Sequence, residues 1–255
     1  MSDYRVKNRN DVEIAINVRI HDQAQGLVFV VHGLGGFKEQ IHIKAMVDAF
    51  HDAGYTVVSH DAANTLGESG GKMEDATLTN YYEDFLDVVT WAKQQDFYSE
   101  PFIVSGHSLG GACSILYASQ FPQDVKAIAP ISAFVGGDSY KNTRDAGNLE
   151  EWKSKGYKME ESKAKPGVMK KINWSFMEDA FTYDLQENAK HITCPVLLVT
   201  GSIDTGTPES SQRLIEDAAQ GPVEIHIIQG MSHNPRSKEH ITQLKELIAG
   251  WLNRL

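Results

Sequence analysis

The sequence predicts an α/β fold in which a mainly parallel sheet is flanked by helices. Short apolar runs alternate along the chain with longer segments of helical periodicity, which is typical of strands joined by covering helices. Most of these runs are continuously apolar, as in strands that are covered on both faces. With 255 residues, of which 41% are hydrophobic, the chain is long enough for one sizeable core, so we expect one domain with an insertion.

The first two strands are expected to pair antiparallel at one edge of the sheet. Residues 12–18 alternate between apolar and polar side chains, which is the pattern of a strand with one covered face. The polar residues 8–11, between this segment and residues 4–6, favour a turn.

Six continuous apolar runs complete a predicted sheet of eight strands. They lie at residues 27–31, 55–58, 102–104, 125–129, 196–199 and 223–228. Helical patterns lie at about residues 39–53, 79–95, 109–120, 208–219 and 237–252. In the last pattern, apolar residues recur at spacings of three and four, which predicts an apolar stripe that packs on the sheet.

One segment, residues 134–190, interrupts this alternation. It is rich in lysine and glutamate, contains scattered aromatic and methionine residues, and has no strand-like run. We interpret it as a small, mostly helical cap insertion over the sheet, between the core segments 1–133 and 191–255 of a single domain. The alternative is a surface excursion without a role, because long insertions are either functional or disordered.

Composition and charge limit the classes of partner. The net charge of −10 disfavours nucleic acids and anionic membranes, which would be repelled, and favours a small, neutral or weakly charged substrate. No run approaches the roughly 20 apolar residues of a membrane span, and the first residues lack the apolar stretch of a secretory signal. We therefore expect a soluble, cytoplasmic protein without stable membrane insertion. A homodimer is compatible with the sequence.

Ser108 is the candidate nucleophile. It lies in residues 106–110, Gly-His-Ser-Leu-Gly, directly after an apolar strand and before a helical pattern, which is the context that a G-x-S-x-G turn requires. Glycines two residues away on each side remove side chains that would collide in such a strained turn. The helix that begins after the serine directs its positive end at a developing oxyanion.

His233 is the candidate general base. It lies just past the last predicted strand, in a loop at the carboxyl edge of the sheet, where ligands bind in open α/β sheets. The other histidines fit this role less well. His226 is within a predicted strand, His240 is within the final helix, and His191 is at the end of the insertion.

Asp204 is the candidate acid that orients the histidine. It follows one predicted strand and precedes a predicted helix. The resulting chain order of Ser108, Asp204 and His233 is the one expected with this type of serine turn. Asp138, placed after the preceding strand, is the reserve candidate, and a turn or cap residue is the alternative interpretation of Asp204.

Two backbone N–H groups are the candidate oxyanion donors. One belongs to Leu109, the residue after the nucleophile. The second is expected from residues 32–36, His-Gly-Leu-Gly-Gly, at the end of the first parallel strand, with Leu34 as the first choice and Gly35 as the alternative. With these groups, attack of the serine on a carbonyl gives an acyl-serine that water releases.

These residues resemble the α/β-hydrolase superfamily over nearly the whole chain outside the insertion. Residues 61–71 are similar to its Asp-x-x-Gly-x-Gly-x-Ser-x-Gly segment, with Asn64 where the family often has glycine. Together with the serine motif, they are similar to the branch of cinnamoyl and feruloyl esterases, monoacylglycerol lipases and serine aminopeptidase-like hydrolases, with the cinnamoyl esterase branch nearest. The resemblance implies the α/β-hydrolase fold and the hydrolysis of carboxylic esters without a metal or cofactor.

Motifs for phosphate, dinucleotide and metal sites are incomplete. Residues 67–73 have three rather than four residues between the glycines of a P-loop, and Lys38 occupies the third-glycine position of a dinucleotide fingerprint. The histidines form no H-E-x-x-H pattern. Cys113 and Cys194 lie beside apolar patterns, which favours buried free thiols over a disulfide or a metal site. We expect no cofactor and no metal ion.

The leading hypothesis is a serine carboxylesterase that hydrolyses small to medium acyl esters through an acyl-serine intermediate. The alternative is a serine aminopeptidase-like peptidase or amidase with the same triad, in which Glu160 or Glu161 of the insertion recognises a free amine. A non-catalytic ligand-binding homologue fits less well, because such receptors can lose triad members that are present here. An acyltransferase, in which an alcohol replaces water, is compatible with the same residues.

Overall fold

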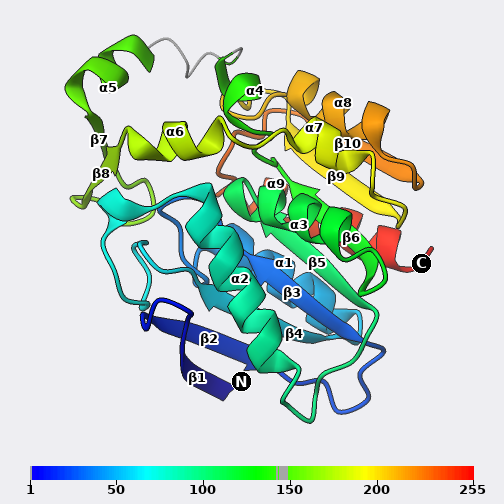
Figure 1. Ribbon diagram of the computed structural model, residues 1–255. Coiled ribbons are helices and arrows are strands. Elements are labelled where there is room, and N and C mark those ends of the chain that lie inside the picture. The colour runs from blue at the N-terminus through cyan, green and yellow to red at the C-terminus, as the bar shows by residue number, and fades with distance from the viewer. Residues whose placement is uncertain (1, 142, 144–148) are drawn as a thin grey trace.

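Eight strands form one sheet at the centre of the computed structural model, which describes residues 2–141, 143 and 149–255 (Figure 1). The strands are β1 (Ser2–Lys7), β2 (Glu13–Arg19), β3 (Leu27–Val31), β4 (Thr56–Asp61), β5 (Phe102–His107), β6 (Val125–Ile131), β9 (Val196–Gly201) and β10 (Val223–Ile228). Their order across the sheet is β1-β2-β4-β3-β5-β6-β9-β10. The prediction of a mainly parallel, eight-stranded sheet is confirmed.

The N-terminal edge of the sheet is antiparallel and the rest is parallel. β1 pairs antiparallel with β2, and β2 pairs antiparallel with β4. The other neighbouring pairs of this sheet are parallel. In the turn between β1 and β2, the side-chain oxygen of Asn8 accepts the N–H groups of Asn10 and Val12 at 3.0 and 2.9 Å. The predicted antiparallel edge and its polar turn are therefore confirmed.

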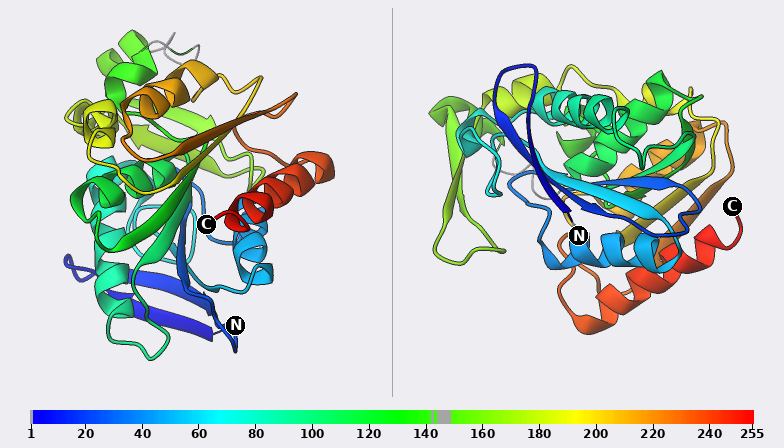
Figure 2. Two further views of the ribbon diagram at one scale, coloured as in Figure 1. Left: turned by 90° about the vertical axis from the view of Figure 1, so that its right-hand side faces the viewer. Right: turned by 90° about the horizontal axis from the view of Figure 1, so that it is seen from below.

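Helices cover both faces of the sheet (Figure 2). On one face, α1 (Ile41–Asp52) and α9 (Lys238–Leu252) lie side by side, and on the other face lie α2 (Leu78–Ala92), α3 (Leu109–Gln120) and α8 (Glu209–Ala218). Each of these helices lies where a helical pattern predicts it, within three residues at either end. None of the described helices combines the length and the apolar character that crossing a bilayer requires.

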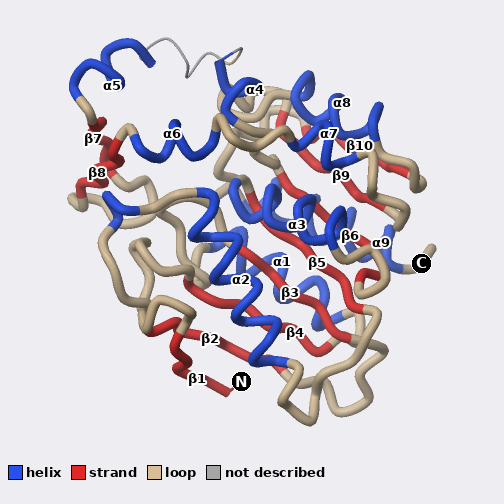
Figure 3. The backbone as a smooth tube through the Cα atoms, in the orientation of Figure 1, coloured by secondary structure: helices blue, strands red, loops and turns tan. Residues whose placement is uncertain are grey.

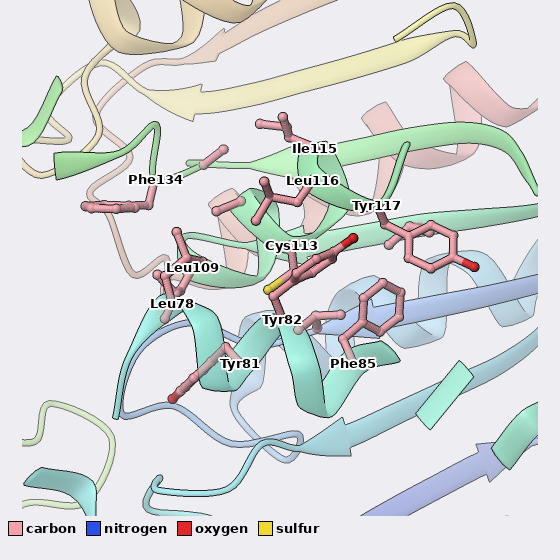
Figure 4. Packing of buried hydrophobic residues seen from close by; sticks show 14 of the residues in the cluster. Leu78, Tyr81, Tyr82, Phe85, Leu109, Cys113, Ile115, Leu116, Tyr117 and Phe134 are labelled. Atoms are coloured by element: carbon pink, nitrogen blue, oxygen red, sulfur yellow. The ribbon is translucent and has the colours of Figure 1, made fainter. Parts of the chain in front are cut away.

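The larger apolar core lies between the sheet and helices α2 and α3 (Figure 4). The ring of Phe29 on β3 contacts Phe85 of α2 and Phe102 of β5, with centroids 5.7 and 4.9 Å apart. Phe85 also contacts Tyr117 of α3, at 5.3 Å. Leu109, the first residue of α3, is buried in the same cluster. Burial of this apolar surface fixes α3, and with it the turn that precedes α3, against the sheet.

The last strand is less buried than the prediction of a strand covered on both faces implies, and its sequence includes Glu224 and His226. β10 lies at the edge of the sheet, and five of its six residues are half-buried. An edge strand has a neighbouring strand on one side only, so part of its surface stays open to water. Cys113 and Cys194 are free thiols, as predicted, but Cys194 is half-buried rather than buried.

The insertion contains a β-hairpin that the sequence does not predict (Figure 3). Its elements are α4 (Gly137–Lys141), α5 (Leu149–Lys155), β7 (Tyr157–Glu161), β8 (Met169–Asn173), α6 (Ser175–Ala180) and α7 (Leu185–Ala189). β7 and β8 pair antiparallel, with Glu160 opposite Lys170. The expectation of a segment without strands is therefore wrong. Charged residues interrupt both strands, so the continuous apolar run that normally indicates a strand is missing.

Replacing Phe85 by alanine is expected to destabilise the protein by about 3–5 kcal/mol, because it removes a fully buried ring and leaves a cavity beneath α3. Urea unfolding followed by circular dichroism measures this loss as a lower transition midpoint. Phe121→Ala is the control, since that side chain is 40% exposed, and we expect it to cost less than about 1 kcal/mol. Equal losses in the two variants would contradict this assignment of the core.

Candidate active site

Ser108 lies at a sharp turn between β5 and α3. Its backbone has φ 54° and ψ −112°, a conformation that residues other than glycine seldom adopt. Its N–H donates to the Ile131 carbonyl at 2.9 Å, and its own carbonyl accepts the Phe134 N–H at 3.0 Å. Hydrogen bonds to β6 and to the segment after β6 therefore hold the serine in this conformation.

Two glycines allow this turn to pack against the sheet. A Cβ atom on Gly106 would lie 2.2 Å from the Gly110 backbone, and one on Gly110 would lie 2.1 Å from the Val31 carbonyl oxygen. Both distances are far inside van der Waals contact, so a side chain at either position would push α3 away from the sheet. The close packing also places the N-terminal end of α3, with its free N–H groups, beside Ser108.

The structure brings Ser108, His233 and Asp204 together. His233 Nε2 lies 3.0 Å from Ser108 Oγ, and His233 Nδ1 lies 3.0 Å from Asp204 Oδ2. The three residues follow β5, β10 and β9, whose carboxyl ends meet at one edge of the parallel sheet. In this arrangement, Nε2 can take the proton of the hydroxyl while Nδ1–H stays bonded to the carboxylate.

Asp204 is held by its own loop as well as by the histidine. Its Oδ1 accepts the N–H groups of Gly206 and Thr207 at 3.0 and 2.9 Å, and its Oδ2 accepts the Thr207 hydroxyl at 2.8 Å. Burial would raise the pKa of Asp204, but the contacts with His233 and Thr207 outweigh it and place that pKa below the usual aspartate value. Thr207 Oγ1 also lies 3.1 Å from His233 Nδ1, a contact that no sequence motif indicated.

The remaining candidates lie outside this group of residues. Asp138, the reserve acid, is on α4, where its side chain is 79% exposed and paired with Lys141. His226 is on β10, His240 is in α9, and His191 follows α7. The structure thus brings together the first-choice residues and leaves out the reserves.

The N–H groups of Leu34 and Leu109 belong to residues that line the cavity next to Ser108. Gly35, the alternative donor, gives its N–H to the hydroxyl of Tyr81 at 3.1 Å. Hydrogen bonds between described residues engage neither the Leu34 nor the Leu109 N–H, so both are available to a bound oxygen. Tyr81 is buried on α2, and nothing in the sequence indicated its contact with this loop.

A buried ion pair holds the loop that carries Leu34. Lys38 Nζ lies 3.0 Å from Asp61 Oδ2, and the Lys38 N–H donates to Asp61 Oδ1 at 2.6 Å. Burial alone would lower the pKa of Lys38, but the Glu68 contact at 2.8 Å and the Asp61 charge raise it above the usual lysine value. The lysine therefore stays charged. Asn64 lies between Asp61 and Glu68, the two acidic partners of Lys38. Its backbone has φ 57°, a conformation that asparagine adopts more readily than most residues.

His107, the residue before the serine, holds the loop that carries His233. Its Nε2–H donates to the His233 carbonyl at 2.7 Å, and its ring packs on that of His42 on α1, with centroids 4.4 Å apart. Burial and the neighbouring His42 and His233 lower the pKa of His107, and burial lowers the pKa of His42 to about 3. Both rings are therefore neutral at pH 7. The only sequence signal for this role is the place of His107 inside the serine motif.

A cavity of about 740 Å³ opens at Ser108 and His233. The insertion provides much of its wall. The lining residues from helices and strands of the insertion, and from the turn between β7 and β8, are Tyr140, Trp152, Lys158, Glu160, Glu161, Ser162, Lys163, Ala164, Pro166, Lys170 and Phe176. Within the part of the chain that the structure describes, no group of three or more His, Cys, Asp or Glu residues is arranged to hold a metal ion.

Comparison with protein families matches residues 22–159 to the family described as serine aminopeptidase, S33. This range is more than half of the 255 residues and includes Ser108, Leu109 and Leu34.

Individual proteins are similar over most of the chain. A 31.7 kDa protein of Escherichia coli, described as uncharacterized and in the traX-finO intergenic region, is 27% identical over 233 residues, which cover 78% of this chain and 80% of that protein. Human palmitoyl-protein thioesterase ABHD10, mitochondrial, is 22% identical over 252 residues, with coverage of 97% and 79%. The structure of Est1E from Butyrivibrio proteoclasticus with ferulic acid bound has a TM-score of 0.83 at 21% identity and covers 98% of both chains, which shows a shared fold.

Replacing His42 by phenylalanine is expected to reduce the loss of stability on acidification. Because the pKa of His42 in the folded protein is about 3, the unfolded chain binds a proton between pH 7 and pH 5 that the folded chain does not bind. This difference lowers the stability of the wild type by about 2 kcal/mol over that interval. Urea unfolding of both proteins at the two pH values measures it, and an equal loss in the variant would count against the buried, neutral state of His42.

Proposed function

The chain belongs to the family of α/β-hydrolases described as serine aminopeptidase, S33, and within this family we propose that it is a serine carboxylesterase. Its substrates are small to medium acyl esters, and it forms an acyl-serine intermediate. The observation that carries this proposal is the arrangement of Ser108 Oγ, the His233 imidazole and the Asp204 carboxylate, with a separation of 3.0 Å at each contact. An adjacent base oriented by a third group is what activates a serine hydroxyl as a nucleophile.

The reaction follows from the positions of these groups. Ser108 Oγ attacks the ester carbonyl carbon while its proton moves to His233 Nε2. The charge that develops on the carbonyl oxygen is stabilised by the N–H groups of Leu34 and Leu109. His233 then protonates the leaving alcohol and afterwards activates the water that releases the acid and restores the serine. Asp204 stabilises the imidazolium in both steps.

The similar proteins support a reaction at an acyl carbonyl. The human relative is named as a palmitoyl-protein thioesterase, and the Est1E structure contains ferulic acid, a carboxylic acid. An activated serine attacks oxygen esters and thioesters through the same acyl-serine intermediate. A substrate panel for this protein therefore includes both kinds of ester.

In the second hypothesis, a peptidase or amidase, Glu160 or Glu161 recognises the free amine of the substrate. Glu160 lies 2.5 Å from Lys170 and 3.6 Å from Lys158. Glu161 accepts the Gly167 N–H at 2.7 Å. Both carboxylates are already engaged by groups of the insertion itself, which favours the esterase over an aminopeptidase.

In this proposal, residues 134–190 act as a cap on a single domain made of residues 1–133 and 191–255. Trp152 of the cap is buried and stacks on Phe176, with ring centroids 6.3 Å apart, and both residues line the cavity. The cap therefore supplies part of the surface against which the acyl group or the alcohol packs.

Ser108→Ala is expected to lower kcat/KM for 4-nitrophenyl butyrate by about 10⁴-fold or more, because the nucleophile is lost. A fluorophosphonate probe should label Ser108 in the wild type, which mass spectrometry of the peptides detects. Ser119→Ala, at the far end of α3, is the matched control and should retain the wild-type rate. Hydrolysis by the Ser108→Ala protein at the rate of this control would refute the assignment.

Thr207→Val is expected to lower kcat about tenfold with little change in KM, since valine removes the hydroxyl that bonds Asp204 and lies beside His233. Asp204→Asn should cost about 10⁴-fold in kcat. Steady-state kinetics on the same ester measures both effects. Thr90→Val, on the exposed side of α2, is the control, and a Thr207→Val rate that matches it would show that the hydroxyl has no part in orienting the histidine.

A further inference from the structure

One face of the hairpin of the insertion carries three charged residues toward the cavity, and the other face carries two methionines that are exposed to solvent. β7 pairs with β8 so that Glu160 lies opposite Lys170. Because successive side chains of a strand point to opposite faces, Lys158, Glu160 and Lys170 share one face, and all three line the cavity. Met159 and Met169, on the other face, are 49% and 53% exposed. The inward face also carries Ile172, which is 1% exposed, and the outward face also carries Lys171.

Lys170 lies directly against the loop of the candidate oxyanion donors. A Cβ atom on Gly35 would lie 2.8 Å from Lys170 Cδ, which places the lysine stem on the residue next to Leu34. The Lys170 side chain is only 14% exposed, and its ammonium lies 2.5 Å from Glu160. The Glu160 carboxylate also lies 3.6 Å from the ammonium group of Lys158. Among the described residues, the Glu160 carboxylate therefore lies between two ammonium groups.

The cavity is basic although the chain is acidic. Its charged lining residues, within the described part of the chain, are the basic Lys158, Lys163, Lys170 and Arg236 and the acidic Glu160 and Glu161. The whole chain carries a net charge of −10. No carboxylate of the described residues lies within 4.0 Å of the charged groups of Lys163 or Arg236. A negatively charged group that enters the cavity thus meets an excess of positive charge in a partly enclosed space.

We propose that the substrates are esters that carry a negatively charged oxygen group, a carboxylate or a phosphate, which Lys170 and Arg236 bind. This inference rests on the proposed esterase function and adds a substrate class to it. Ammonium and guanidinium groups donate charge-assisted hydrogen bonds to such oxygens, and these bonds are stronger than those between neutral groups. The net charge of the whole chain, which favours neutral substrates, does not describe the local charge of the cavity.

Two pairs of esters test this selectivity. Monoethyl adipate and ethyl hexanoate differ by a carboxylate on the acyl side, whereas 1-butyrylglycerol 3-phosphate and 1-butyrylglycerol differ by a phosphate on the alcohol side. We expect kcat/KM for the anionic ester to exceed that of its neutral partner by about tenfold or more in at least one pair. The pair that responds distinguishes a carboxylate from a phosphate. Ratios near or below one in both pairs would overturn the inference.

Single substitutions then test the two residues. Lys170→Met keeps an unbranched stem over Gly35 but removes the charge, and it should lower the anionic-to-neutral ratio about fivefold. Arg236→Gln is an independent second variant with the same expected direction. Lys171→Met is the matched control, because Lys171 lies on the outward face of the hairpin, 2.9 Å from Glu74. The anionic-to-neutral ratio of kcat/KM in this variant should equal that of the wild type. An unchanged ratio in both Lys170→Met and Arg236→Gln would overturn the assignment.

Binding to the Ser108→Ala protein separates this inference from the proposed function. Isothermal titration calorimetry with the same ester pairs should give a Kd about tenfold lower for the anionic member of the selected pair. If the wild type hydrolyses none of the four esters but the anionic one binds more tightly, the esterase proposal fails and the selectivity stands. Equal Kd values within each pair overturn the selectivity, whatever the rates of hydrolysis.

Discussion

The close packing of the β5–α3 turn against β3 is the constraint on which the candidate site depends. Gly110 approaches the Val31 carbonyl so closely that no side chain fits between them. That contact fixes the beginning of α3, and the apolar core around Phe85 keeps the helix in place. Ser108 is therefore presented by rigid secondary structure, so the distance from its hydroxyl to the base is fixed before a substrate binds.

Buried polar contacts join the neighbouring loops to this turn. His107, beside the serine, donates to the His233 carbonyl, and Lys38 joins the loop of Leu34 to Asp61 at the end of β4. Gly33 of that loop lies so close to Ser108 that a Cβ on the glycine would be 3.0 Å from the serine Cβ. Loss of the Lys38 side chain would leave the buried Asp61 carboxylate without its ion-pair partner, which costs more than the contact itself contributes. The candidate base and the candidate oxyanion donors are thus coupled to the position of the serine.

The core and the insertion contribute different properties to the same cavity. Loops of the core hold the reacting groups, whereas the hairpin of the insertion presents Lys158, Glu160 and Lys170 beside them. In the proposed reaction, acyl transfer uses only the first set, and we propose that the choice among esters depends on the second. Under this proposal, a change on the inward face of the hairpin alters the substrate without moving Ser108.

The sequence by itself determined where the eight strands of the main sheet and the five helices that cover it follow one another along the chain, because apolar periodicity is a local property that repeats along the chain. It also indicated Ser108, Asp204 and His233 as candidates, since each follows a predicted strand and parallel strands end at one edge of the sheet. Only the tertiary structure decided that Thr207 contacts both the acid and the base, and that Lys170 lies over the oxyanion loop. Those contacts join residues that no local pattern links. The alternating charges of the hairpin fit either face of a strand, and packing on the cavity selects the face that turns inward.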